Sequence, residues 1–112
     1  MPEEIQDETR NLISQFQISQ QQMQSILIQK ESLKLQGLEI ERALEELKST
    51  KEKTAYKISG QIMISKPVEE LKKELKETKE NIDIRIGSLE KSEGRISDKL
   101  KELQNKLKEV IK

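Results

Sequence analysis

Hydrophobic residues follow a helical spacing through the first part of this 112-residue chain. From residue 5 to residue 47, alternating steps of four and three residues reach thirteen positions, of which nine are apolar. Such spacing places apolar side chains in one stripe along a helix and is typical of a coiled coil. The pattern predicts a helix over residues 3–48, whose stripe consists of Ile5, Leu12, Phe16, Met23, Ile26, Leu33, Ile40, Leu44 and Leu47.

A second helical stripe occupies the last part of the chain. It predicts a helix over residues 67–111, because Pro67 suits a first helical turn and the acidic Glu69 and Glu70 suit the positive end of the helix dipole. The stripe widens towards the C-terminus, where further apolar residues lie one position beside it. Its members are Val68, Leu71, Leu75, Ile82, Leu89, Ile96, Leu103 and Val110, with Ile86, Leu100 and Leu107 beside them.

Between the two stripes, apolar residues recur at every second position, which is the period of a β-strand. Tyr56 and Ile58 would share one face of a first strand, and Ile62 and Ile64 would share the same face of a second. The Ser-Gly dipeptide between them suits a tight turn, because glycine accepts positive φ without a Cβ clash. We therefore expect a β-hairpin over residues 55–65.

The three patterns together predict a mainly α fold. It is a long antiparallel two-helix coiled coil with a single β-hairpin at the bend, in one unit that spans residues 1–112. The polar residues 49–54 would connect the first helix to the hairpin.

One register aligns both stripes along their full length, and it places Leu33 opposite Ile82 and Lys30 opposite Arg85. In this register apolar layers are frequent near the hairpin and are interrupted by polar layers further out. We therefore expect firm pairing near the hairpin and loose helix ends that expose apolar side chains.

The composition removes several classes of function. Lys plus Arg and Asp plus Glu both number 21, so the net charge is zero and no dedicated nucleic-acid surface is expected. Cysteine and histidine are absent from the sequence, which removes disulfides, thiolate and imidazole metal ligands and the usual catalytic bases near neutral pH. The chain has no Gly-rich phosphate loop, and its carboxylates fall on charged helical flanks. We expect neither an enzyme nor a cofactor.

The sequence also gives no sign of a membrane partner. It contains no apolar run of about 18 residues, which is the length that a spanning helix needs. The start Met1-Pro-Glu-Glu lacks the basic region and hydrophobic core of a secretion signal. We therefore expect a cytoplasmic protein.

The predicted hairpin would be marginal by itself, because two isolated strands bury little and leave unpaired backbone groups at both edges. The simplest remedy is pairing with hairpins of other subunits into a larger sheet or barrel. We therefore expect the hairpin to be the oligomerisation element, acting through Tyr56, Ile58, Gly60, Ile62 and Ile64.

The segment Ala55-Tyr-Lys-Ile-Ser-Gly-Gln-Ile-Met-Ile64, placed between two heptad arms, resembles the hairpin of archaeal-type β-class prefoldin subunits. The motifs Leu89-Glu-Lys-Ser-Glu93 and Leu100-Lys-Glu-Leu103 also fit this family. The resemblance implies a complex of two α-class and four β-class chains whose hairpins assemble into β-barrels. It further implies that the ends of the coiled coils hold unfolded polypeptides and pass them to a group II chaperonin without ATP.

By their position at the helix ends, the resemblance assigns client binding to Ile5, Leu12, Ile13, Phe16, Leu100, Leu103, Leu107, Val110 and Ile111. An alternative is a structural coiled-coil scaffold or tether, in which the same residues pack against a fixed partner. A scaffold should not suppress the aggregation of unrelated unfolded proteins, and this difference separates the two hypotheses.

Overall fold

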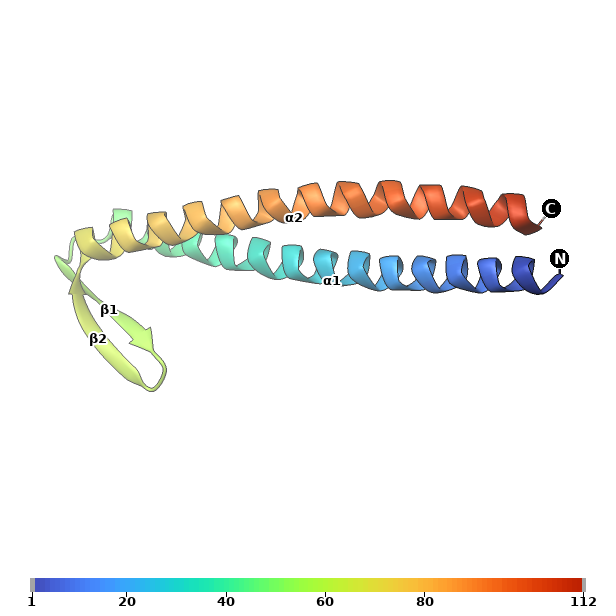
Figure 1. Ribbon diagram of the computed structural model, residues 1–112. Helices are drawn as coiled ribbons and strands as arrows, with labels where there is room; N and C mark the ends of the chain where they lie inside the picture. Colours follow the sequence, from blue (N-terminus) through green and yellow to red (C-terminus); the bar gives the residue numbers. More distant parts are fainter. Residues whose placement is uncertain (1, 112) are drawn as a thin grey trace. The chain divides into compact units, whose positions relative to one another are not determined.

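The computed structural model describes the backbone of residues 2–111 and the side chains of residues 6–110. In chain order it consists of α1 (Pro2–Ser49), β1 (Thr54–Ser59), β2 (Ile62–Pro67) and α2 (Val68–Ile111) (Figure 1). The predicted fold class, with two long helices and one hairpin, is therefore confirmed.

The chain divides into two compact units. The first, here called the terminal unit, consists of Met1–Glu31 and Gly87–Lys112. The second, here called the hairpin unit, consists of Ser32–Ile86 and contains both strands with the adjoining parts of α1 and α2.

The hairpin unit is held by apolar side chains from the facing sides of its two helical segments. Lys79 at the flank of this interface adds an ion pair across it, with its Nζ atom 3.2 Å from Oε1 of Glu41. The unit has a narrow core rather than a thick one, as expected for two paired helices. Its buried apolar residues are Leu33, Val68, Leu71 and Ile82.

The contacts in this unit differ from the predicted register. Ile82 lies beside Gly37, since a Cβ atom placed on Gly37 would be 4.0 Å from the Cγ2 atom of Ile82. The residue predicted opposite Ile82 was Leu33, which precedes Gly37 by four residues, or about one helical turn. The branched side chain of Ile82 thus lies against Gly37, at a distance that would still admit a Cβ atom.

In the terminal unit, Leu12 and Leu103 are buried, as is Ser19. Lys30 was predicted to face Arg85, but its Nζ atom lies 2.7 Å from Oε2 of Glu93. The long lysine side chain reaches a carboxylate instead of a like charge, which is the electrostatically favourable choice. The register prediction was therefore wrong at this position too.

The two strands form an antiparallel hairpin in which Ser59 pairs with Ile62 and Thr54 pairs with Pro67. The turn therefore consists of Gly60 and Gln61, one residue later than the predicted Ser-Gly turn. Gly60 has φ of 61°, and no non-glycine residue described here has positive φ. Glycine at the first central position with positive φ is the arrangement of a type II′ turn, which matches the twist of the strands.

Pro67 is the last residue of β2, whereas the sequence analysis predicted it as the first residue of the second helix. The backbone N–H of Val68 donates a hydrogen bond of 2.9 Å to the carbonyl oxygen of Lys53, which continues the strand pairing one step past the proline. Proline is tolerated here because it stands at the end of a two-stranded sheet, where its missing N–H interrupts no inner ladder.

The register fixes which hairpin side chains share a face, because directly paired residues of an antiparallel ladder lie on the same side. Ile58 pairs with Met63, and Lys57 pairs with Ile64. Apolar residues therefore occupy both faces of the hairpin. Tyr56 and Ile58 lie on the face opposite to that of Ile62 and Ile64, so the four do not form one common face.

Within the part of the chain that the structure describes, neither helix is both long enough and apolar enough to cross a membrane.

Candidate functional site

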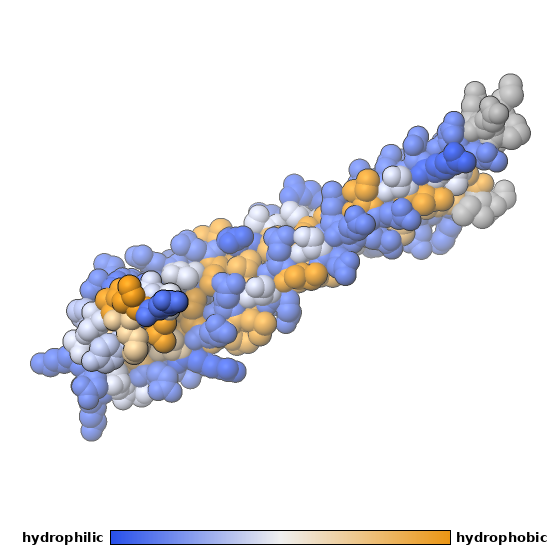
Figure 2. Space-filling view, turned by 90° about the horizontal axis from the view of Figure 1, so that it is seen from below, coloured by the Kyte–Doolittle hydropathy of each residue, from blue (hydrophilic) through white to orange (hydrophobic). Residues whose placement is uncertain are grey.

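The hairpin exposes large apolar side chains that a sheet would normally bury. Tyr56 is 70% exposed and Ile58 is 72% exposed, and on the other face Ile62 is 64% exposed and Ile64 is 41% exposed. Figure 2 shows hydrophobic atoms gathered over the hairpin at the left end of the view. Exposed apolar side chains therefore lie on both faces of the hairpin, and large exposed apolar surface is typical of interaction sites.

Met63 belongs to the same exposed set, at 64% exposure, although the sequence analysis did not include it. It follows Ile62 directly and so falls on the other face of β2, where it pairs with Ile58. Alternation of side chains along β2, counted from the first residue after the turn, would have placed Met63 on the same face as Ile58. The register, which depends on the turn position, decides this face.

The two faces of the hairpin have different surroundings. We call the face with Lys57, Ile62, Ile64, Lys66 and Ala55 the helix-side face, because both of its lysines reach α2. We call the face with Tyr56, Ile58, Met63 and Ser65 the outer face. On the helix-side face Ala55 and Lys66 are half-buried, whereas every member of the outer face is exposed.

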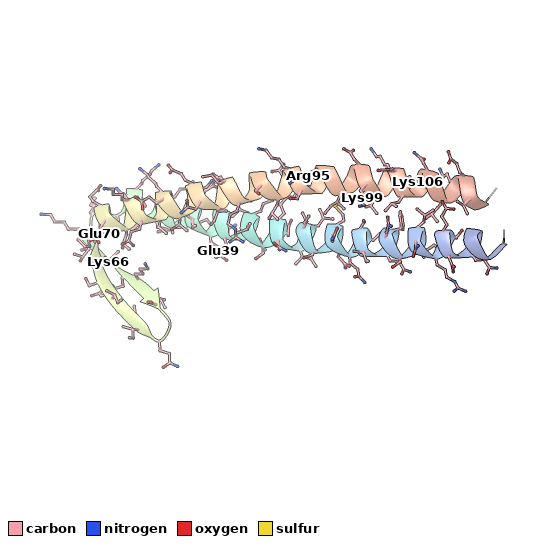
Figure 3. The ribbon with its side chains drawn as sticks, viewed as in Figure 1. Glu39, Lys66, Glu70, Arg95, Lys99 and Lys106 are labelled. Atoms are coloured by element: carbon pink, nitrogen blue, oxygen red, sulfur yellow. The ribbon has the colours of Figure 1, made fainter. Side chains whose placement is uncertain are left out.

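Glu74, in the second turn of α2, joins both strands to the helix. Its Oε1 atom lies 2.7 Å from Nζ of Lys66 on β2, and its Oε2 atom lies 3.5 Å from Nζ of Lys57 on β1. Figure 3 shows Lys66 at the base of the hairpin, near the start of α2, where Glu70 lies. One carboxylate thus connects the helix to two strands.

The electrostatics of this contact favour its charged form. The hydrogen bond from Lys66 lowers the pKa of Glu74 below its ordinary value, with a smaller contribution from the charge of Lys57. The same hydrogen bond raises the pKa of Lys66 above its ordinary value. Each group is therefore stabilised in its ionised state across the neutral range.

Between the hairpin and the helices of the same unit lies a groove with a volume of about 520 Å³. Leu47 and Ala43 of α1 and Leu71 and Leu75 of α2 contribute to its lining, and β1 contributes Ala55, Tyr56 and Lys57. The hairpin therefore does not pack tightly against the helices along its length.

The free edges of the hairpin are a further feature of the site. The sheet has two strands in the order β1-β2, so each strand is paired on one side only. Unpaired N–H and C=O groups on an edge can accept a strand from another chain. The hairpin therefore offers both apolar faces and hydrogen-bonding edges to a partner.

The residues predicted at the helix ends have unequal exposure. Ile13 is 43% exposed, and Phe16, Leu100, Leu107 and Val110 are half-buried. Leu12 and Leu103 are buried in the pairing between α1 and α2. The side chains of Ile5 and Ile111 lie outside the described residues.

Other exposed apolar residues of the terminal unit were not among the predicted client-binding residues. They all lie on α1, outside the heptad stripe, and their off-stripe positions are the signal that could have identified them. They are Ile18, Leu27 and Ile28, which are 52%, 44% and 63% exposed.

Within the described part of the chain, no group of three acidic side chains is placed to hold a metal ion.

Comparison with known proteins gives consistent matches over nearly the full length. A family model described as prefoldin subunit matches residues 10–112. The prefoldin subunit beta of Archaeoglobus fulgidus is 34% identical over 109 residues, covering 96% of this chain and 94% of the relative. The corresponding subunit of Methanospirillum hungatei is 38% identical over 108 residues, covering 96% of this chain and 90% of the relative.

A solved structure has the same fold. The crystal structure of the prefoldin beta subunit from Thermococcus strain KS-1 superimposes with a TM-score of 0.80 at 29% sequence identity. The match covers 91% of this chain and 90% of the other.

Proposed function

Since the chain belongs to the prefoldin subunit family, we propose that it is a β-class subunit of an ATP-independent chaperone. It assembles through its hairpin, holds unfolded polypeptides at the helix ends and delivers them to a group II chaperonin. The observation that carries this proposal is the hairpin, which leaves apolar residues exposed on both faces.

Assembly follows from the physical state of the hairpin. Two strands with exposed Tyr56, Ile58, Ile62 and Ile64 gain little stability in isolation, and burying these side chains against another hairpin is worth about 25 cal/mol per Å² of apolar surface. The proposed complex contains two α-class and four β-class chains. Hairpin pairing would also satisfy the open edges of β1 and β2.

Client holding is proposed for the terminal unit. Ile13 is exposed there, and the half-buried Phe16 lies three residues further along α1, on a neighbouring part of the same helix surface. Exposed Ile18 adds apolar surface on another side of the helix. Apolar contacts need no particular client sequence, which suits a protein that binds many unfolded chains.

Leu12 and Leu103 have a different role in this proposal. Both are buried, so they keep α1 and α2 paired and leave the direct contacts to the exposed residues. The half-buried Leu100, Leu107 and Val110 would contribute their accessible surface.

The test is native mass spectrometry of this chain mixed with a candidate α-class subunit. The expected result is a complex of two α-class and four β-class chains. Ile58→Asp, which puts a charge on the outer face, should prevent its formation. Ile84→Asp is the matched control, because Ile84 lies on α2 in the same unit and is 70% exposed, close to the 72% of Ile58.

Two outcomes would count against this function. If the chain stays a discrete dimer whatever the partner and the variant, a structural scaffold takes the place of the chaperone subunit. If Ile84→Asp prevents assembly as strongly as Ile58→Asp, the loss reflects added charge in general and the hairpin is not the assembly element.

A further inference from the structure

Glu74 is the single helix residue, among residues 6–110, that forms ion pairs with the strands. It lies in α2 of the hairpin unit, and its partners are Lys57 on β1 and Lys66 on β2. At the base of the hairpin, the backbone N–H of Val68 donates a hydrogen bond to the carbonyl oxygen of Lys53. The hairpin is thus attached at its base and at one point on its helix-side face.

The two lysines meet Glu74 from different positions along the hairpin. Lys66 is next to Pro67 at the base, whereas Lys57 pairs with Ile64, two steps nearer to the turn. A contact with one strand would let the hairpin rotate about that point. Contacts with both strands restrain its rotation about the strand axis as well as its tilt towards α2.

Apolar packing cannot supply the same restraint. The groove of about 520 Å³ separates the hairpin from the helices, and Ala55 is the one apolar hairpin residue that is half-buried within the described chain. Ile62 and Ile64 point to the helix-side face yet remain exposed. Among the described residues, the ion pairs of Glu74 are therefore the side-chain contacts that join both strands to α2.

We propose that Glu74 is a positioning residue for assembly, which holds the helix-side face of the hairpin towards α2 and so presents the outer face to a partner hairpin. This inference rests on the proposed function, since it concerns how the assembly element is oriented. The occupant of the outer face is the apolar hairpin of another prefoldin-type subunit. Tyr56, Ile58 and Met63 form the surface that it covers.

The choice of face has a physical basis. A partner that approached the helix-side face would have to break or bury the ion pairs of Glu74, and removing charges from water is costly. The outer face carries two large apolar residues and a tyrosine and has no charged member among Tyr56, Ile58, Met63 and Ser65. Its burial therefore costs less than burial of the helix-side face.

The experiment measures the orientation of the hairpin directly. The chain has no native cysteine, so spin labels can be placed at Gln61 in the turn and at Glu80 on α2. Both positions are exposed and lie in the hairpin unit. Double electron–electron resonance on the full-length labelled chain should give one narrow distance. Glu74→Gln, which removes the charge at almost constant shape, should lose that narrow distance and give a broad distribution.

The matched control is Glu77→Gln, because Glu77 is exposed on the same helix and forms no ion pair within the described residues. It should keep the narrow distance. The triple variant Lys57→Glu, Lys66→Glu, Glu74→Lys reverses every charge of the contact and should restore it. Helix content and thermal unfolding, measured by circular dichroism, should stay unchanged in Glu74→Gln, which separates positioning from a general loss of structure.

Assembly of the same variants is read by native mass spectrometry with the α-class subunit. Glu74→Gln should lower the yield of the full complex, and the triple variant should recover it. If Glu74→Gln keeps the narrow distance, or broadens it while assembling as well as the unmodified chain, the inference is overturned. If the unmodified chain does not assemble, the proposed function fails, and the role of Glu74 in assembly fails with it. The distance measurement would still show whether Glu74 holds the hairpin in one orientation.

Discussion

At the scale of single residues, the four glycines differ in whether their positions require glycine. Gly60 adopts φ of 61° in the hairpin turn, and a Cβ atom at Gly37 would be in ordinary contact with Ile82. A Cβ atom at Gly87 or Gly94 would have no neighbouring heavy atom within 4 Å. These last two positions therefore carry the backbone cost of glycine in a helix without a contact that requires it.

Replacing Gly87 or Gly94 by alanine should raise the free energy of unfolding by about 1 kcal/mol each, the difference in helix propensity between the two residues. Urea unfolding monitored by circular dichroism measures this. Gly60→Ala is the contrasting variant, since alanine is strained at positive φ, and it should weaken assembly while leaving the helices intact. A fall in stability for Gly87→Ala would show that its surroundings are more crowded than the structure indicates.

The charged contact of Glu74 should depend on pH in a definite direction. The hydrogen bond from Lys66 lowers the pKa of Glu74. The contribution of the ion pairs to holding the hairpin is therefore fully present above the ordinary glutamate pKa, and it is lost as the pH falls through the lowered value. The pKa of Lys66 is raised, so its contribution is lost only as pH rises through that raised value. Lys57 and Glu70 are the other charged groups that act on this contact.

At neutral pH, the distance between the labels at Gln61 and Glu80 should be narrow in the unmodified chain and broad in Glu74→Gln. As the pH is lowered, the unmodified chain should broaden until the two distributions coincide. Resonance measurements across this range, at constant ionic strength because salt also screens the pairs, provide the test. A narrow distribution that persists at acidic pH would mean that the ion pairs do not position the hairpin.

At the scale of elements, the sequence predicted both helices and the hairpin because each has its own hydrophobic period. The pairing between helices was not predictable to the same accuracy. A heptad spacing specifies which side chains face the partner helix, but layers shifted by about one turn look similar in sequence. Two residues that interrupt the apolar stripe make contacts that show the observed register. Gly37 lies beside Ile82, and Lys30 forms an ion pair with Glu93.

The contact between Glu74 and the strands was beyond sequence analysis for another reason. The chain has 21 acidic residues and 21 basic residues, so charged pairs at many spacings are possible. Glu74 meets Lys57 and Lys66 only because the hairpin turns back towards α2, and nothing in their spacing distinguishes them from their neighbours.

The ion pair between Lys30 and Glu93 should affect the pairing of α1 and α2 in the terminal unit. The side chains are only 16% and 28% exposed, so Glu93→Leu would leave the Lys30 ammonium without its partner in the helix interface. The melting temperature of the Glu93→Leu protein should therefore fall. The double variant Lys30→Leu, Glu93→Leu replaces both charges by apolar groups and should recover or exceed the original melting temperature. Scanning calorimetry compares the three proteins, and an unchanged melting temperature in Glu93→Leu would show that water already screens this pair.

At the scale of the whole molecule, the proposed activity depends on two surfaces that can be changed separately. The hairpin carries the proposed assembly surface, and the terminal unit carries the exposed apolar residues proposed to hold clients. Each client contact is weak alone, whereas several chains in one complex gain from effective concentration, which can raise avidity by about 10²–10⁴-fold. Suppression of aggregation should therefore require both surfaces in the same assembled complex.

Two variants should lose this activity for opposite reasons. Ile58→Asp leaves Ile13 and Ile18 intact but prevents assembly, so suppression of the aggregation of an unfolded test protein should fall at equal chain concentration. The double variant Ile13→Ser, Ile18→Ser should assemble normally and still lose suppression, because its client surface is less apolar. Ile28→Ser is the control, since Ile28 is more exposed than either residue but lies ten residues further from the start of α1 than Ile18. Light scattering measures aggregation and native mass spectrometry measures assembly. If unassembled Ile58→Asp chains suppress aggregation as well as the complex does, each chain binds clients independently, and multivalency contributes nothing to the activity.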